Sequence, residues 1–124
     1  MAVALILFAH GARDPAWAEP VRRVQAAIRA IDPRVRVEAA FLELMTPSLA
    51  DCGAALAAEG FERVVVLPMF IAQSGHLKRD VPEILAVLQA RFPAVRFELA
   101  QAVGENEAMI RAMAEAGLSL LAGS

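Results

Sequence analysis

The strongest constraint on the fold is an alternation between two kinds of segment, which occurs four times along the chain. Short, continuous apolar runs are typical of strands covered on both faces, and they occupy Val3–Phe8, Val35–Phe41, Arg63–Met69 and Val95–Leu99. A segment of helical periodicity follows each run. Because parallel neighbouring strands need long crossover connections, the alternation predicts an α/β fold, namely a three-layer sandwich with a four-stranded parallel sheet and flavodoxin-like topology.

Start and stop signals define the first two predicted helices. The first begins at Asp14-Pro15, with aspartate as N-cap and proline in the first turn. Its apolar stripe consists of Trp17, Val21, Val24, Ile28 and Ile31. The second helix begins at Thr46-Pro47-Ser48 and ends at Gly60.

The last two helices are predicted in the same way. Asp80 and Glu83 have the spacing of a capping box, which predicts a helix that begins at Asp80 and ends before Phe92-Pro93. The final helix is expected over Glu105–Leu121. Its apolar side consists of Met109, Ile110, Met113 and Leu120, and we interpret this stripe as a core or subunit contact.

Charge and composition exclude several classes of protein. The 124 residues carry a formal net charge of −2, so the basic excess that nucleic acids and anionic membranes require is missing. The longest apolar runs, Met1–Ala9 and Val64–Ala72, are too short to span a bilayer, and no basic residue precedes the first one as in a secretory signal. We therefore expect one soluble, cytoplasmic domain over residues 1–124.

The single cysteine, Cys52, excludes a disulfide framework and a cysteine-rich zinc site. It falls on the apolar side of the second predicted helix, together with Leu49 and Leu56. We therefore expect a buried structural thiol.

Polar residues that could carry chemistry follow the predicted strands. His10 follows the first strand, Glu43 the second, and the loop Ile71–Gly75 leads from the third to His76, while Gln101 follows the fourth. His10 and His76 are the two histidines of the chain. Because open parallel sheets bind ligands at the carboxyl ends of their strands, these side chains are expected at one edge.

Two imidazoles and one carboxylate form a plausible site for a divalent transition metal. Three protein ligands leave coordination positions open, as in a reactive site, and the same groups can accept protons. Gly11 and Gly75, next to the histidines, would allow a ligand to approach the backbone closely. The alternative is that the histidines are ordinary capping or surface residues and that Glu43 is an ordinary loop carboxylate.

Cationic residues flank both histidines: Arg13 near His10, and Lys78 and Arg79 after His76. With Asp14 and Asp80 as helix caps, two helix N-termini would point at the same cleft and favour anions there. We interpret the cations as partners for the carboxylates of an acidic ligand. The alternative is solvated charge on exposed loops.

Three motifs in this order resemble those of the small sirohydrochlorin chelatases of the cobalamin and sirohaem pathways. The segment Leu5–Pro15, with its His10-Gly11-Ala12-Arg13-Asp14-Pro15 core, is similar to the opening motif of that family. Phe41-Leu42-Glu43 resembles the second motif, and Pro68–His76 followed by Lys78-Arg79-Asp80-Val81-Pro82 resembles the third. Two departures are visible: Ala12 replaces the usual serine, and Gly75 stands directly before the histidine.

The resemblance implies a chelatase-type α/β sandwich in which His10, Glu43 and His76 contact the metal. It implies insertion of Co²⁺ into the acidic tetrapyrrole sirohydrochlorin, with release of two protons, in cobalamin biosynthesis. Fe²⁺, as in sirohaem synthesis, and Ni²⁺ are the alternative metals, and the metal is a substrate, with no organic cofactor. A chain of this length resembles one half of the larger relatives, which implies a homodimer around a tetrapyrrole cleft.

Three rival functions remain open. A non-catalytic carrier of metal or tetrapyrrole would need the same ligands as a chelatase. His10-Gly11 also resembles the strand end of histidine phosphatases, but Ala9 stands where those enzymes have the phosphate-binding arginine. The third possibility is a purely structural flavodoxin-like domain, which has no need of both histidines at one edge.

Overall fold

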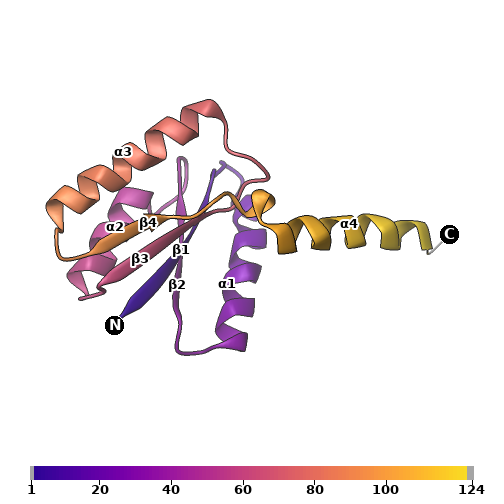
Figure 1. Ribbon diagram of the computed structural model, residues 1–124, viewed down its shortest axis with the longest axis horizontal. Coiled ribbons are helices and arrows are strands. Elements are labelled where there is room, and N and C mark those ends of the chain that lie inside the picture. Colours follow the sequence, from indigo (N-terminus) through magenta and orange to yellow (C-terminus); the bar gives the residue numbers. More distant parts are fainter. Residues whose placement is uncertain (1, 123–124) are drawn as a thin grey trace.

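The predicted parallel sheet is present. The computed structural model describes residues 2–122, except for the side chain of His76. The sheet is built from β1 (Val3–Ala9), β2 (Arg36–Phe41), β3 (Arg63–Pro68) and β4 (Arg96–Leu99). All neighbours are parallel, in the order β2-β1-β3-β4 (Figure 1). The four strands agree with the sequence prediction to within one or two residues at each end.

The register brings the carboxyl ends of three strands together. Ala9 at the end of β1 pairs with Phe41 of β2, and Phe8 pairs with Pro68 of β3. The hydrogen bonding between β1 and β3 continues one residue past the end of β3, because the Met69 amide donates to the Phe8 carbonyl (2.8 Å). Segments that follow β1, β2 and β3 therefore emerge side by side at one edge of the sheet.

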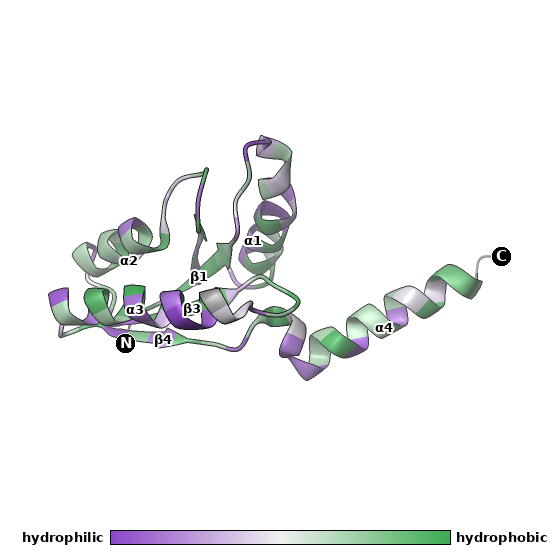
Figure 2. Cartoon of the chain, turned by 90° about the horizontal axis from the view of Figure 1, so that it is seen from above, coloured by the Kyte–Doolittle hydropathy of each residue, from purple (hydrophilic) through white to green (hydrophobic). Residues whose placement is uncertain are grey.

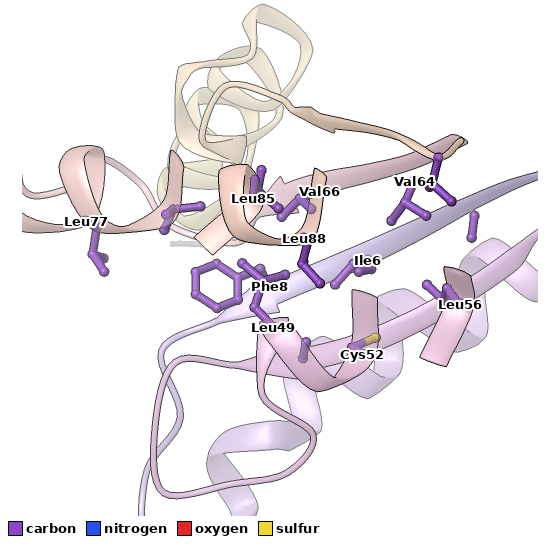
Figure 3. Close-up of a cluster of buried hydrophobic side chains, with 14 residues drawn as sticks. Ile6, Phe8, Leu49, Cys52, Leu56, Val64, Val66, Leu77, Leu85 and Leu88 are labelled. Carbon is purple, nitrogen blue, oxygen red and sulfur yellow. The ribbon is translucent and has the colours of Figure 1, made fainter. Parts of the chain in front are cut away.

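Helices cover both faces of the sheet, as the sequence predicts. Helix α1 (Glu19–Ile31) lies on one face, and α2 (Leu49–Ala58) and α3 (Gly75–Arg91) lie on the other (Figures 1 and 2). Alternate strand residues face the two layers. The larger core cluster lies under α2 and α3 and contains Ile6, Phe8, Val64, Val66, Leu49, Leu56 and Leu88 (Figure 3). A smaller cluster of Leu7, Val21 and Val37 lies under α1.

Helix α1 begins later than predicted, and both ends of its apolar stripe are exposed. Pro15–Ala18 form a 3-10 turn, and α1 starts at Glu19, where Pro20 suits the first helical turn because it has no N–H to satisfy. The predicted buried stripe is correct for Val21, which is 6% exposed. It is wrong for Trp17 and Ile31, which are 72% and 84% exposed. These two residues lie beyond the part of the helix that packs on the sheet.

Helix α3 begins earlier than predicted, so the proposed cap at Asp80 is wrong. The cap is Ser74, whose Oγ accepts from the Leu77 amide (3.3 Å). Asp80 and Pro82 lie inside the helix. The physical reason is the spacing of the buried side chains Leu77, Val81, Leu85 and Leu88, which extends the apolar face back before Asp80.

The last helix, α4 (Glu107–Ala122), extends away from the rest of the molecule (Figures 1 and 2). It follows a short 3-10 turn over Val103–Glu105. None of its residues is buried, and Met109, Ile110 and Met113 are each about 40% exposed. The sequence predicted the helix but not that it would leave the body of its own chain. In the described part of the chain, no helix has the length and apolar character needed to cross a bilayer.

Candidate functional site

His10 and Glu43 lie at the ends of the adjacent strands β1 and β2. The His10 Nε2 and Glu43 Oε1 atoms are 3.9 Å apart, and the two side chains are 62% and 57% exposed. An imidazole nitrogen and a carboxylate oxygen thus face each other at an open edge of the sheet. The sequence predicted this juxtaposition from the strand ends alone.

Main-chain contacts hold the two residues beside each other. The Leu42 amide donates to the Ala9 carbonyl (2.9 Å), and the Glu43 amide donates to the His10 carbonyl (3.1 Å). Gly11 has a φ of +91°, and a Cβ there would collide with the Glu43 carbonyl oxygen. Glycine is therefore required at this position, both for its backbone conformation and for the close approach of the second segment.

The loop after β2 is closed on itself, which fixes the direction in which Glu43 leaves the sheet. The Phe41 amide donates to the Pro47 carbonyl (2.9 Å), so residues 42–47 return to the end of the strand. Leu44 has a φ of +64°, and the Thr46–Pro47 peptide bond is cis. Ser48 then caps α2 by accepting from the Asp51 amide (3.1 Å), as the predicted helix start requires.

The third predicted ligand is placed only by its backbone. His76 is the second residue of α3, and its side chain lies outside the described part of the structure. Among the side chains that are described, no group of three histidine, cysteine, aspartate or glutamate residues could hold a metal. The His10–Glu43 pair is therefore the described part of the candidate site.

A mostly apolar hollow of about 400 Å³ adjoins His10. It lies between the β1 end, the start of α1 and the segment that follows β3, and it is lined by Ala9, His10, Gly11, Ala12, Trp17, Pro20, Val21, Met69 and Phe70. The Phe70 ring meets the buried Phe8 ring edge-on, with centroids 5.9 Å apart, which anchors this wall to the core.

A second hollow, of about 490 Å³, shares Met69 with the first and is lined by Val24, Leu67, Met69, Ala100, Gln101, Val103, Asn106, Ala108 and Met109. Gln101, the polar residue that the sequence placed after the fourth strand, is thus in this neighbouring hollow. The two hollows therefore lie on either side of Met69, which lines both.

The cations and the second glycine that the sequence singled out lie around the site rather than in the hollow beside His10. Arg13 is exposed and lines a smaller hollow of about 240 Å³ together with Arg22, a residue that the sequence analysis did not single out. Lys78 and Arg79 are exposed within α3. Gly75 begins that helix, and a Cβ there would meet no atom within 4 Å, so no packing contact requires glycine.

The helix caps near these cations agree with only half of the prediction. Asp14 Oδ1 accepts from the Ala16 amide (2.9 Å) and caps the turn beside His10, as predicted. No cap exists at Asp80, so the N-terminus that lies nearest His76 is the one capped by Ser74. Trp17, which lines the hollow beside His10, was not among the predicted site residues because its spacing matched the apolar stripe of α1.

The chemistry of the described pair suits a divalent metal that is held loosely. Imidazole nitrogen and carboxylate oxygen both bind first-row transition metals, and neither retains them as strongly as thiolate binds a soft metal. Cys52 does not supply a thiolate here, because it is buried in the core and burial raises its pKa to about 11.

Comparison with known proteins agrees with this reading of the fold. The chain is 32% identical over 85 residues to the sirohydrochlorin cobaltochelatase of Methanopyrus kandleri. The match covers 68% of this chain and 59% of that protein, so the chain spans about three-fifths of the length of this relative. It is 27% identical over 114 residues to the sirohydrochlorin ferrochelatase of Bacillus subtilis, covering 91% of this chain and 43% of that one.

A solved structure is similar over almost the whole chain. The CbiX protein of Marinobacter aquaeolei VT8 superposes with a TM-score of 0.84 at 29% identity, covering 98% of this chain and 99% of that one. The CbiX family model matches residues 4–117, which include all four strands apart from Val3 and contain the His10–Glu43 pair. The chain therefore belongs to the CbiX family.

Proposed function

We propose that this protein is a metal chelatase, a lyase that inserts Co²⁺ into sirohydrochlorin in cobalamin biosynthesis. The observation that carries the proposal is the His10–Glu43 pair, 3.9 Å apart at an open sheet edge beside an apolar hollow, in a chain of the CbiX family. The names of two relatives, a cobaltochelatase and a ferrochelatase of sirohydrochlorin, support the substrate. Residues 1–124 act as one chelatase-like domain in this proposal.

The metal is a substrate, and His10, Glu43 and His76 are its proposed ligands. Two imidazoles and one carboxylate bind a divalent ion firmly enough to place it, yet weakly enough to transfer it to four pyrrole nitrogens. Co²⁺ is preferred, and Fe²⁺ and Ni²⁺ suit the same ligands. Because His10 and Glu43 are more than half exposed, water and ligand can reach the ion.

The reaction releases two protons from the pyrrole N–H groups while the metal forms bonds to the pyrrole nitrogens. As the metal leaves the protein, the imidazoles of His10 and His76 become free to accept these protons, and Glu43 relays them or remains a ligand. A macrocycle held in the hollow beside His10 would meet the metal at close range, which replaces a slow bimolecular encounter.

Substrate carboxylates need cationic partners at the rim of the site. Arg13 lies close to the His10 edge of the molecule, and Lys78 and Arg79 lie in the first turns of α3, near the backbone of His76. We assign these three residues to carboxylate binding, and Gly11 and Gly75 to close approach of the ring. Arg22, beside Arg13, is a further candidate.

We also propose that the protein is a homodimer, with α4 as a subunit contact. The helix leaves the body of its own chain and keeps Met109, Ile110 and Met113 about 40% exposed. A helix of 16 residues with an apolar side and no buried residue is not stabilised by packing within the described chain. A second copy would offer the missing surface, as in exchange of an identical element between protomers.

The test of the chelatase is incubation with sirohydrochlorin and Co²⁺, Fe²⁺ or Ni²⁺ in turn, followed by absorbance spectra. We expect more than one equivalent of metallated product per chain, and a single equivalent would favour the carrier instead. His76→Ala should abolish insertion with the circular dichroism spectrum unchanged. Glu62→Gln, an exposed carboxylate before β3 at the opposite edge, is the control and should keep the full rate. Full activity of His76→Ala would contradict the ligand assignment.

A further inference from the structure

Trp17 is the largest exposed apolar side chain next to the candidate site. It is 72% exposed, although tryptophan is usually well covered in folded proteins. It also lines the same hollow of about 400 Å³ as His10. An exposed indole that shares a hollow with a proposed metal ligand presents a flat, apolar surface to whatever enters.

The backbone that carries the indole is held in place by its own turn. Asp14 accepts twice from this turn: its Oδ1 from the Ala16 amide (2.9 Å) and its carbonyl from the Trp17 amide (3.1 Å). Pro15 restricts the backbone at the start, and Ala18, directly after Trp17, is 1% exposed. The turn is thus fixed at both ends, so the backbone position of Trp17 outside the packed face of α1 is set by the fold.

The surroundings of Trp17 suit a flat, conjugated ring with acidic substituents. Met69 and Phe70 line the same hollow, and Met69 also lines the second hollow. A thioether and aromatic rings give favourable contacts to the face of a π-system. Arg13 lies in the adjoining hollow and can meet a carboxylate at the edge of such a ring.

We propose that Trp17 contacts the macrocycle of the tetrapyrrole and contributes to its affinity, while it contributes nothing to metal binding. This inference rests on the proposed function for the identity of the ligand. The contact places the ring on the α1 side of His10, between Trp17 and the Met69–Phe70 segment. Trp17 is therefore a substrate-contacting residue outside the set that holds the metal.

The chain is well suited to a direct test, because Trp17 is its only tryptophan and it contains no tyrosine. Tryptophan emission therefore reports on this one position. We expect saturable quenching when metal-free sirohydrochlorin is added to the wild-type protein. The sirohydrochlorin itself absorbs light and lowers the signal at any position. The control is therefore the double variant Trp17→Phe/Ile31→Trp, in which the single tryptophan lies at the exposed far end of α1. The control should show weaker saturable quenching than the wild-type protein, because energy transfer to a bound ring falls steeply with distance.

Kinetics provide the second test. Trp17→Ala should raise the KM for sirohydrochlorin about tenfold, as expected for loss of one stacking contact, and leave kcat within about twofold. Trp17→Phe should recover most of this loss. The affinity for Co²⁺ alone, measured by calorimetry, should not change in either variant.

Three results would overturn the inference. The first is equal quenching at both positions, and the second is an unchanged KM in Trp17→Ala. The third is an emission shift on dilution of the ligand-free protein, which would place Trp17 against a second copy. Failure of the chelatase proposal is distinguishable from these. In that case sirohydrochlorin would quench Trp17 but no metal would be inserted, whereas insertion with an unaffected Trp17→Ala variant would remove this inference alone.

Discussion

The carbonyl oxygen of Glu43 occupies the space that any side chain on Gly11 would need. The contact lies beside the Glu43-to-His10 main-chain hydrogen bond of 3.1 Å. The spacing between the two proposed ligands is therefore set by how closely two backbone segments approach, and a glycine is what permits this approach.

Gly11→Ala should consequently damage both the fold and the site. Alanine is strained at a φ of +91° and would also push the Glu43 segment away. We expect a loss of about 2 kcal/mol or more in the free energy of unfolding, measured by denaturant titration, and weaker Co²⁺ binding. Gly60→Ala is the matched control: its φ is +97°, but no atom lies within 4 Å of the added Cβ, so only the smaller backbone cost should appear. Equal losses in the two variants would refute the close-approach argument.

His10→Ala should lose more chelatase activity than Glu43→Ala. The imidazole of His10 is proposed to act as ligand and as proton acceptor, whereas the carboxylate 3.9 Å away can be replaced in part by water or by a substrate carboxylate. The measurement is kcat/KM with sirohydrochlorin and Co²⁺, and His10→Ala is expected to lie at least about tenfold below Glu43→Ala. A reversed order would assign the main role to the carboxylate.

Charge on the apolar side of α4 should separate the proposed dimer. Met113→Glu places a carboxylate on the stripe that includes Met109 and Ile110, and we expect the monomer in sedimentation equilibrium. Glu115→Lys changes a charge on the opposite side of the helix, two residues or about 200° away, and should remain dimeric. A wild-type protein that sediments as a monomer at all concentrations would contradict the proposal.

Cys52 should be unreactive in the folded protein. Burial in the core raises its pKa to about 11, so very little thiolate exists at pH 8, and the sulfur is also shielded from reagents. We expect reaction with a disulfide reagent to be more than about 100-fold slower than in denaturant, where the thiol should react at the rate of a free cysteine. Rapid labelling of the native protein would show that α2 opens readily.

The ion pair at the amino end of the sheet should make stability depend on pH. Arg63 donates to both oxygens of Glu98 (3.0 and 2.7 Å) and lowers the pKa of that carboxyl. A lowered pKa in the folded state means that the charged carboxylate stabilises the protein above the pKa of the unfolded chain and stops doing so as pH falls through the folded value. Glu98→Gln should therefore be less stable than wild type at pH 7, with a difference that shrinks towards pH 3. The control for loss of one exposed charge is Glu62→Gln, and an identical pH trend there would contradict this cause.

The sequence predicted the sheet well because buried parallel strands depend on local composition. The Val64–Val66 run of β3 can hardly be placed except between two layers, and the strand ends then position His10 and Glu43 without further information. The juxtaposition of these two residues was accessible for that reason. Their main-chain contact was not, because it depends on the φ of Gly11 and on the closed turn after β2.

Features that depend on competition between neighbouring signals were harder to predict. Asp80 and Glu83 have the spacing of a capping box, but Ser74 caps the helix because the buried side chains Leu77 and Val81 extend its packed face to earlier turns. Trp17 matches the period of α1, yet the helix starts after it, at Glu19, so the indole lies outside the packed face. The direction of α4 has no local signal at all, because an apolar stripe is the same whether it packs on its own chain or on another.

The main-chain pairing of residues 10 and 43 has a consequence for how such a site can change over time. Since the amide of Glu43 is held by the His10 carbonyl, a substitution at position 43 would exchange the proposed donor atom while the backbone that carries it stays in place. If Glu43 is a ligand as proposed, one substitution at this strand end would change the ligand set without any change in the surrounding backbone.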